Sequence, residues 1–258
     1  MKLLAIGDVV SDSGCEALSR LLPRIKREYS IDVCIANGEN SAKGNGLLPD
    51  SAKSLIYSGV DMITTGNHVF RRREASEFLD ESDCCLRPYN MHPSCPGKGV
   101  GIIDMGRYKV GVINLIGNAY FNASYANVFD SLDRAIEEIG DCKIKVVDFH
   151  AEATGEKRAL GLYADGRVSA FFGTHTHVQT ADAQLLPNKT GYITDLGMCG
   201  SKNSVLGIEP ECIIRSLKTG MPTLFKAKDT DIALNGCIFE IDETTGKAVS
   251  VEAINIEV

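Results

Sequence analysis

Short apolar runs alternate with helical stretches in the first third of the chain, and each apolar run stops at a polar cluster. The apolar runs are residues 2–7, 31–36 and 60–65. Between them, residues 13–29 and 49–59 have the spacing of helices, and Pro23 predicts a kink in the first of these. Strands that alternate with helices are typical of crossover connections, so we expect a largely parallel sheet.

The pattern of the sequence changes from about residue 98. Residues 100–105 and 108–115 flank a Gly106-Arg107 turn and predict a hairpin. The other predicted elements are helices over 130–139 and 153–163, strands over 144–149 and 168–172, and a hairpin of 232–241 with 248–256. No Pro/Gly/Ser-rich linker or internal repeat separates the halves. We therefore expect residues 1–258 to form one α/β domain, with two packed mixed β-sheets flanked by helices.

The charge balance excludes several classes of partner. The chain has 27 Lys and Arg against 34 Asp and Glu, a formal net charge of −7. This argues against membrane binding and against an extended nucleic-acid surface, so local cations must hold any anionic substrate. The first apolar run is interrupted by Asp8, too early for a signal peptide, and no run approaches ~18 apolar residues. The nine cysteines include no CxxC pair, which predicts reduced thiols in a cytoplasmic protein.

Five polar clusters stand at the ends of apolar runs, where strands of an open α/β sheet bind ligands. They are Gly7-Asp8, Gly38-Glu39-Asn40, Gly66-Asn67-His68, Asp148-Phe149-His150 and Gly173-Thr174-His175-Thr176-His177. Asp148 aside, they offer two carboxylates, two side-chain amides and four of the five histidines, without a thiolate. This oxygen and nitrogen set suits one or two ions of manganese, iron or zinc.

Each cluster alone has a plain structural explanation, such as a helix cap for Asp8 or a turn for Asn67. His175 and His177 are the stronger signal, because residues two apart on an extended segment face the same side. The conjunction favours a metal site, since four of five histidines follow predicted strands. Asp148 could orient an imidazole or bind local backbone, and we assign it no role. His92 also receives no role. Residues 71–73 are three arginines, which fit the solvated start of a helix.

The order of these motifs resembles that of the calcineurin-like metallophosphoesterases. The spellings GDVV, NGEN, TGNH, DFHAEAT and GTHTHVQTAD are most similar to the bacterial YmdB-like proteins. The resemblance implies an αββα sandwich over essentially the whole chain. Two departures from the wider superfamily stand out: Val10 occupies the position of a common histidine ligand, and Glu39 replaces the common bridging aspartate.

The resemblance also implies two divalent or transition-metal ions per chain, with iron or manganese favoured and zinc suitable. Glu39 would bridge them. Asp8, Asn40 and His177 would complete the first site, with the Asn40 amide oxygen replacing the missing imidazole. Asn67, His150 and His175 would complete the second site. His68 would remain uncoordinated and would transfer the proton to the leaving group.

The activity that the resemblance implies is that of a dinuclear-metal phosphodiesterase acting on small cyclic nucleotides, opening 2′,3′-cyclic nucleotides to 3′-nucleotides. Two alternatives stay open: a general metallophosphatase or nucleotidase, and a nucleotide-sensing regulatory metalloprotein with slow turnover. We also expect a homo-oligomer.

Overall fold

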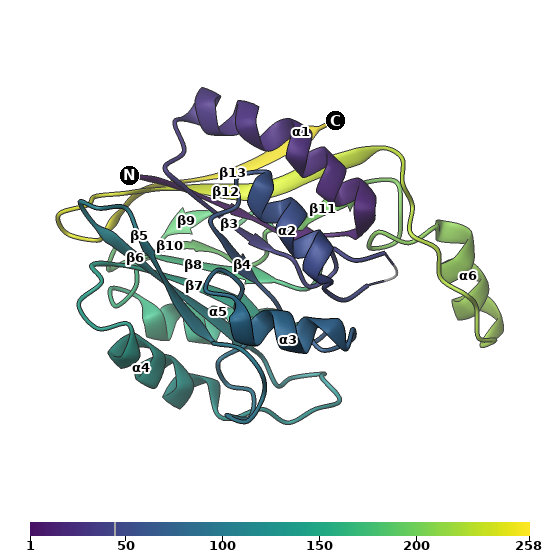
Figure 1. Ribbon diagram of the computed structural model, residues 1–258, viewed down its shortest axis with the longest axis horizontal. Helices are drawn as coiled ribbons and strands as arrows, with labels where there is room; N and C mark the ends of the chain where they lie inside the picture. The colour runs from purple at the N-terminus through teal and green to yellow at the C-terminus, as the bar shows by residue number, and fades with distance from the viewer. Residues whose placement is uncertain (44) are drawn as a thin grey trace.

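The computed structural model describes residues 1–43 and 45–258, which form six helices and thirteen strands (Figure 1). The helices are α1 (Ser11–Tyr29), α2 (Pro49–Tyr57), α3 (Glu74–Glu81), α4 (Val128–Glu138), α5 (Thr154–Ala164) and α6 (Pro210–Thr219). The strands of the first sheet are β1 (Lys2–Ile6), β2 (Asp8–Val9), β3 (Val33–Asn37), β4 (Met62–Thr64), β11 (Met198–Ser201), β12 (Ile232–Ile241) and β13 (Ala248–Glu257). The strands of the second sheet are β5 (Val100–Asp104), β6 (Lys109–Ile116), β7 (Ile144–His150), β8 (Ala170–Thr174), β9 (Gln184–Leu185) and β10 (Gly191–Ile193).

The first sheet has the strand order β2-β11-β12-β1-β3-β4, and β13 pairs with β12. β1, β3 and β4 are parallel to one another, whereas β12 runs antiparallel to β1. The sheet is therefore mixed, and the carboxyl ends of β1, β3 and β4 lie along one edge. These are the strands whose ends carry the first three polar clusters.

The second sheet has the order β5-β6-β7-β8-β10-β9. β6, β7, β8 and β10 are parallel, and the edge strands β5 and β9 are antiparallel to their neighbours. Both faces of the central strands are covered, because β7 and β8 are buried along almost their whole length. Such strands are nearly continuous apolar runs in the sequence, which is why they were predictable.

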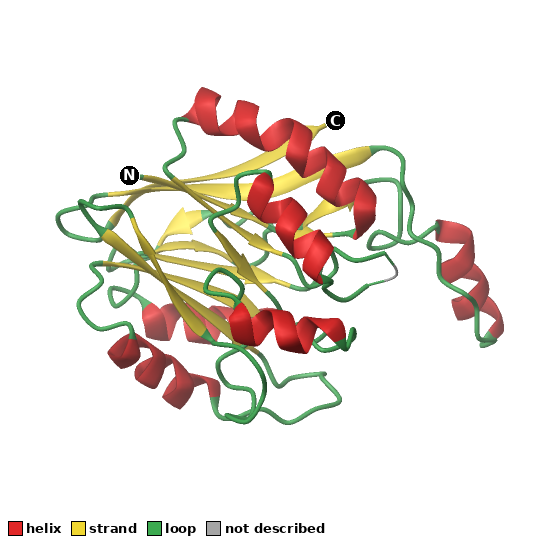
Figure 2. Ribbon diagram, in the orientation of Figure 1, coloured by secondary structure: helices red, strands yellow, loops and turns green. Residues whose placement is uncertain are grey.

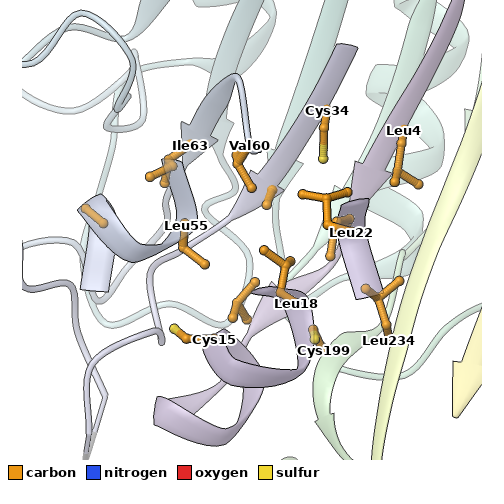
Figure 3. Close-up of a cluster of buried hydrophobic side chains, with 14 of the residues drawn as sticks. Leu4, Cys15, Leu18, Leu22, Cys34, Leu55, Val60, Ile63, Cys199 and Leu234 are labelled. Atoms are coloured by element: carbon orange, nitrogen blue, oxygen red, sulfur yellow. The ribbon is translucent and has the colours of Figure 1, made fainter. Parts of the chain in front are cut away.

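Apolar side chains fill three layers, with helices on the outer faces of both sheets (Figure 2). Leu4, Leu18, Leu22 and Leu55 belong to the cluster that packs α1 and α2 against the first sheet (Figure 3). The cluster between the sheets contains Leu3, Ala5, Ile35, Val112, Val146 and Phe239. Alternate residues of β1 thus enter different layers, as the two faces of a strand require. The expected arrangement of two packed mixed sheets flanked by helices is confirmed.

Most predicted elements are present within one to three residues of their expected limits. Helix α1 continues through Pro23, from Ser11 to Tyr29, so this proline does not end the helix. Helix α3 begins directly after the three arginines of residues 71–73, and the structure adds α6 and the short strands β2, β9, β10 and β11, which the sequence did not reveal. All nine cysteines, each in the described part of the chain, are free thiols. Among the described residues, no helix is long and apolar enough to cross a membrane.

Candidate metal centre

The predicted site residues lie together where the carboxyl ends of the two sheets meet. The first sheet contributes Asp8 in β2, Glu39 and Asn40 after β3, and Asn67 and His68 after β4. The second sheet contributes His150 at the end of β7, with His175 and His177 after β8. All five polar clusters of the sequence thus converge, although they are separated by up to 167 residues between Asp8 and His175.

Three side chains converge on Nε2 of His150. This nitrogen lies 3.0 Å from Asn67 Oδ1, 3.0 Å from His175 Nδ1 and 3.3 Å from Glu39 Oε1. Glu39, His150 and His175 form a group whose ligand atoms all lie within 4.8 Å of one another. Two imidazoles, an amide oxygen and a carboxylate facing one point are a suitable ligand set for a transition metal.

A second group of side chains surrounds Asp8. Its Oδ1 lies 3.6 Å from His177 Nε2, and Asn40 Nδ2 lies 3.3 Å from both His177 Nε2 and Glu39 Oε1. Asp8 Oδ2 accepts a hydrogen bond from the His175 backbone, but Oδ1 is buried and has no hydrogen-bond partner among the described residues. Buried carboxylate oxygens are normally paired, so the free lone pairs of Oδ1 fit a cation. Glu39 takes part in both groups.

The Asn40 side chain is oriented differently from the expectation. Its Nδ2 faces Glu39 and His177, and its Oδ1 lies 2.9 Å from His68 Nδ1. Ligation through the amide oxygen therefore requires a half-turn of the terminal amide. That rotation exchanges two groups of nearly equal size, and Nδ2 would then donate to His68.

The charges of the site are mutually stabilised. Burial by itself raises the pKa of Asp8 and Glu39, but the neighbouring histidines outweigh it and lower both values. Burial disfavours a charged His150, yet the Glu39 carboxylate raises the pKa of His150 to about 9. Burial, with the charge of His150, lowers the pKa of His175 to about 4. The carboxylates are thus ionised and His175 is neutral at pH 7, which are the forms that bind metals.

Asp148 acts on His150 through Thr174. The Thr174 hydroxyl donates to Asp148 Oδ1 over 2.7 Å and lies 3.0 Å from His150 Nδ1. Burial raises the pKa of Asp148 to about 6, although hydrogen bonds from Thr64 and Thr174 act in the opposite direction. At pH 7 the carboxylate is therefore still ionised and can only accept hydrogen bonds. Since the hydroxyl gives its proton to Asp148, it must accept one from His150 Nδ1. In the neutral form of His150, Nε2 is therefore the bare nitrogen, and it is the one that faces the cluster.

His177 is oriented by a residue outside the motifs. Its Nδ1 lies 3.1 Å from the Leu206 carbonyl oxygen, which can only accept a hydrogen bond. The proton therefore sits on Nδ1, and Nε2 is left for the group around Asp8. Nothing in the sequence near Leu206 indicated this contact, because a backbone carbonyl has no residue signature.

The two histidines after β8 are not on an extended segment, so that prediction is wrong. His175 and His177 have φ angles of 104° and 62°, in the left-handed region. Their imidazoles still reach the same cluster, because the backbone between them is held by Asp195, whose Oδ2 accepts the Thr176 N–H. Left-handed residues other than glycine cost about 1–3 kcal/mol each, and such strain is concentrated at functional sites.

Two motif glycines make room for the site. A Cβ at residue 66 would lie 2.2 Å from His150 Cδ2, so Gly66 lets the ring reach the cluster. A Cβ at residue 173 would lie 1.9 Å from the Thr194 carbonyl oxygen. Both glycines are therefore needed for close approach, as expected where a backbone passes a packed group.

His68 lies beside both groups. Its backbone N–H donates to Glu39 Oε2 over 2.9 Å, and its ring Nδ1 is 3.2 Å from Glu39 Oε1. Within the described part of the chain, every hydrogen bond to the His68 ring goes to Nδ1. The ring is partly exposed and lines a cavity of about 390 Å³ in front of the cluster.

Three residues near the site have no signal in the sequence. Glu152 Oε2 lies 3.0 Å from His175 Nε2, and the Phe121 ring centre lies 4.9 Å from that of His175. Phe225 lines the cavity from the other end of the chain. His92 instead contacts Ser94 at the surface. Arg72 donates to the backbone of Lys43 and Asn45, which is a structural contact.

Comparisons with known proteins agree over the whole chain. A family model described as "YmdB-like protein" matches residues 4–254. A 2′,3′-cyclic-nucleotide 2′-phosphodiesterase of Bacillus subtilis (strain 168) is 42% identical over 257 residues, 99% of this chain and 97% of that protein.

Two solved structures are also closely similar. A hypothetical protein from Thermus thermophilus has a TM-score of 0.93 at 38% identity, covering 100% of this chain and 99% of that one. A phosphatase from Mycoplasma pneumoniae has a TM-score of 0.93 at 35% identity, covering 100% and 93%. The family resemblance and the fold class expected from the sequence are both confirmed.

Proposed function

The chain belongs to the YmdB-like family, and from this membership we propose that it is a metal-dependent phosphodiesterase that opens 2′,3′-cyclic nucleotides to 3′-nucleotides. The observation that carries the proposal is the position of Glu39, whose Oε1 lies within 3.3 Å of both His150 Nε2 and Asn40 Nδ2. One buried carboxylate thus takes part in two ligand groups that open on one cavity.

We propose that the two groups hold two metal ions bridged by Glu39. The first ion would be held by Asp8, Asn40 and His177, and the second by Asn67, His150 and His175. The mixed oxygen and nitrogen set, without thiolate, favours iron or manganese and also suits zinc. When bound, such a pair of cations acidifies water and neutralises the phosphate charge.

The chain's own residues then have separate tasks. Thr174 and the Leu206 carbonyl fix the protons of His150 and His177 on Nδ1, which directs Nε2 of each ring inward. His68 is the proposed proton donor to the 2′-oxygen as it leaves. Contact with Asn40 and Glu39 keeps its ring at the mouth of the site, where a protonated imidazole can donate to a leaving alkoxide.

The domain organisation, cellular location and assembly of the enzyme belong to the same proposal. Because the proposed ligands come from both sheets, we propose that residues 1–258 act as one domain. The free cysteines favour an enzyme that acts in the reducing cytoplasm. The homo-oligomer expected from the sequence stays a prediction.

Product analysis tests the proposed activity against its alternatives. With 2′,3′-cyclic AMP as substrate and iron or manganese supplied, we expect 3′-AMP alone, because only the 2′-oxygen would lie near His68. A large share of 2′-AMP, or faster hydrolysis of a phosphomonoester such as p-nitrophenyl phosphate, would instead favour the general phosphatase. Tight nucleotide binding with very slow turnover would favour the nucleotide sensor.

A further inference from the structure

Part of the lining of the cavity at the candidate metal centre is apolar, and it is built from residues outside the five polar clusters. We propose that this wall, formed by Val10, Leu206, Ile208 and Phe225, binds the nucleobase of the substrate, with Phe225 as the stacking residue. The proposal rests on the proposed function and deepens it by assigning the part of the protein that recognises the nucleoside.

The wall and the candidate ligands line the same cavity. Glu39, Asn40, His175 and His177 line this space, whose volume of about 390 Å³ lies in the range of small-molecule sites, roughly 300–1,000 Å³. A molecule that carries both a phosphate and a flat apolar ring matches a lining that combines these ligands with apolar side chains. A nucleotide has that form, whereas a simple phosphomonoester would leave the wall uncovered.

The wall has a fixed backbone. Residues on either side of α6 pair with each other: the Glu209 N–H donates to the Lys226 carbonyl, and the Lys228 N–H donates to the Gly207 carbonyl, both over 2.9 Å. Ile208 and Ala227 face each other in this pairing. α6 itself projects from the body of the molecule beyond this ladder (Figure 1). The ladder therefore holds Ile208 in place without help from the helix, and Phe225 directly precedes Lys226, whose carbonyl takes part in it.

The same ladder is tied to the candidate ligands. The Leu206 carbonyl accepts the hydrogen bond from His177, and a Cβ at residue 207 would lie 2.7 Å from Val10 Cγ1. Gly207 has a φ of 92°, so this turn packs directly against Val10. The hydrogen bond to His177 thus ties the wall to a candidate ligand, and the contact with Val10 joins two parts of the wall.

Phe225 and Leu206, which stand beside the paired residues of the ladder, are highly exposed for apolar side chains. Their exposed fractions are 53% and 48%. Phe225 also lines a second, neighbouring hollow with Lys43 and Lys226, so solvent reaches it from both cavities. An exposed ring of this kind is a stacking platform, and base stacking on an aromatic side chain contributes about 1–3 kcal/mol.

The chemistry of the wall predicts its selectivity. Its side chains are aliphatic or phenyl and carry no hydrogen-bonding group, so they do not read the edges of a base. Stacking depends on the area of the ring, so we expect purine nucleotides to bind more tightly than pyrimidine nucleotides. Adenine and guanine nucleotides should differ little.

Binding measurements on the metal-loaded protein test the wall directly. Phe225→Ala should weaken binding of 3′-AMP about tenfold, with the affinity for inorganic phosphate unchanged. Phe225→Tyr should bind 3′-AMP as the wild type does. Leu224→Ala is the matched control, because Leu224 is 81% exposed beside Phe225 but does not line the cavity. Equal weakening by both alanine variants, or no weakening by Phe225→Ala, would overturn the proposal.

Kinetics separate this proposal from the proposed function. Phe225→Ala should raise KM for 2′,3′-cyclic AMP about tenfold, while the 2,3-cyclic phosphate of 1,4-anhydroerythritol, which lacks a base, should be hydrolysed as by the wild type. If the wild type binds 3′-AMP no more tightly than phosphate, the base site is wrong. If binding depends on Phe225 but no cyclic phosphate is hydrolysed, the base site stands and the proposed function is wrong.

Discussion

The Lys157 ammonium lies 2.6 Å from Asp195 Oδ2, and each side chain is only 1% exposed. The same carboxylate accepts the Thr176 N–H through Oδ2 and the Gly197 N–H through Oδ1. The Gly197 carbonyl in turn accepts the Asp8 N–H. This buried ion pair therefore holds the backbone on both sides of the candidate metal centre, although neither residue lines it.

Removing the cation should loosen this backbone. Lys157→Met leaves the Asp195 charge buried without a partner, and we expect the free energy of unfolding to fall by about 3–5 kcal/mol in urea titrations. Metal affinity, measured against a chelator, should fall with it. The double variant Lys157→Met, Asp195→Asn should recover part of the stability, since no charge is then stranded. Wild-type stability for the single variant would contradict this account.

Two metal ions per chain are expected from elemental analysis of protein purified without chelator. His150→Ala and His177→Ala should each lose about one ion, because each removes an imidazole from a different ligand group. His92→Ala is the control and should keep both ions, since within residues 1–43 and 45–258 the hydrogen bonds of the His92 ring go to Ser94. At most one ion in the wild type would refute the dinuclear centre.

His68→Ala should separate catalysis from metal binding. The variant keeps the backbone N–H that donates to Glu39, so we expect both ions to remain while kcat falls by ~10²–10⁴. Asn67→Ala should lose metal and activity together, because its Oδ1 faces His150 Nε2. The assignment of His68 is wrong if His68→Ala also loses a metal ion or if its rate is unchanged.

Thr174→Val tests the link between Asp148 and His150. The isosteric change removes the acceptor for His150 Nδ1–H, and we expect metal affinity to fall about 10–100-fold in chelator competition. Thr174→Ser keeps the hydroxyl and should bind metal normally. Thr190→Val, which removes another buried hydroxyl that donates to the Val168 carbonyl, should lower stability but not metal affinity. The link is disproved if Thr174→Val and Thr190→Val bind metal equally well.

Asp182 should make stability depend on pH in the acid range. Burial raises its pKa, but hydrogen bonds from Thr194 and Thr180 outweigh this and lower it below the ordinary value of 3.8. Its contribution is therefore present above about pH 4 and is lost as the pH falls through the folded-state pKa. Asp182→Asn should be less stable than the wild type near pH 7, on the order of 1 kcal/mol, and the gap should narrow toward pH 3. A gap that is constant with pH would exclude this role.

The sequence predicted the parts of the molecule that carry local signals. β1, β3, β7 and β8 are continuous apolar runs, and the polar residues that follow them were correctly expected to meet. Helix α1 was recognised from the spacing of its leucines, although Pro23 proved compatible with an unbroken helix. These features depend on neighbouring residues, so one segment suffices to detect each of them.

The features that the sequence did not reveal depend on contacts between distant segments. β2, β9 and β11 have only two to four residues, too few to show a period. None of the side chains of α6 is buried, so the helix has no core-facing side that its sequence could have revealed. Lys157, Thr174 and the Leu206 carbonyl act through partners far away in the sequence. The left-handed backbone of His175 and His177 was likewise invisible, because it is imposed by packing around Asp195.

The position of β12 within the first sheet sets when the metal centre can form in the life of the protein. β12 comprises Ile232–Ile241 of a 258-residue chain, yet it lies between β11 and β1, and β11 in turn pairs with the strand that carries Asp8. A ribosome delivers β1 long before β12, at about 5–20 residues per second. The nascent chain therefore exposes Asp8 and Glu39 before their sheet can close. The candidate metal centre can take its final form only once β12 has been synthesised and has paired with β1 and β11.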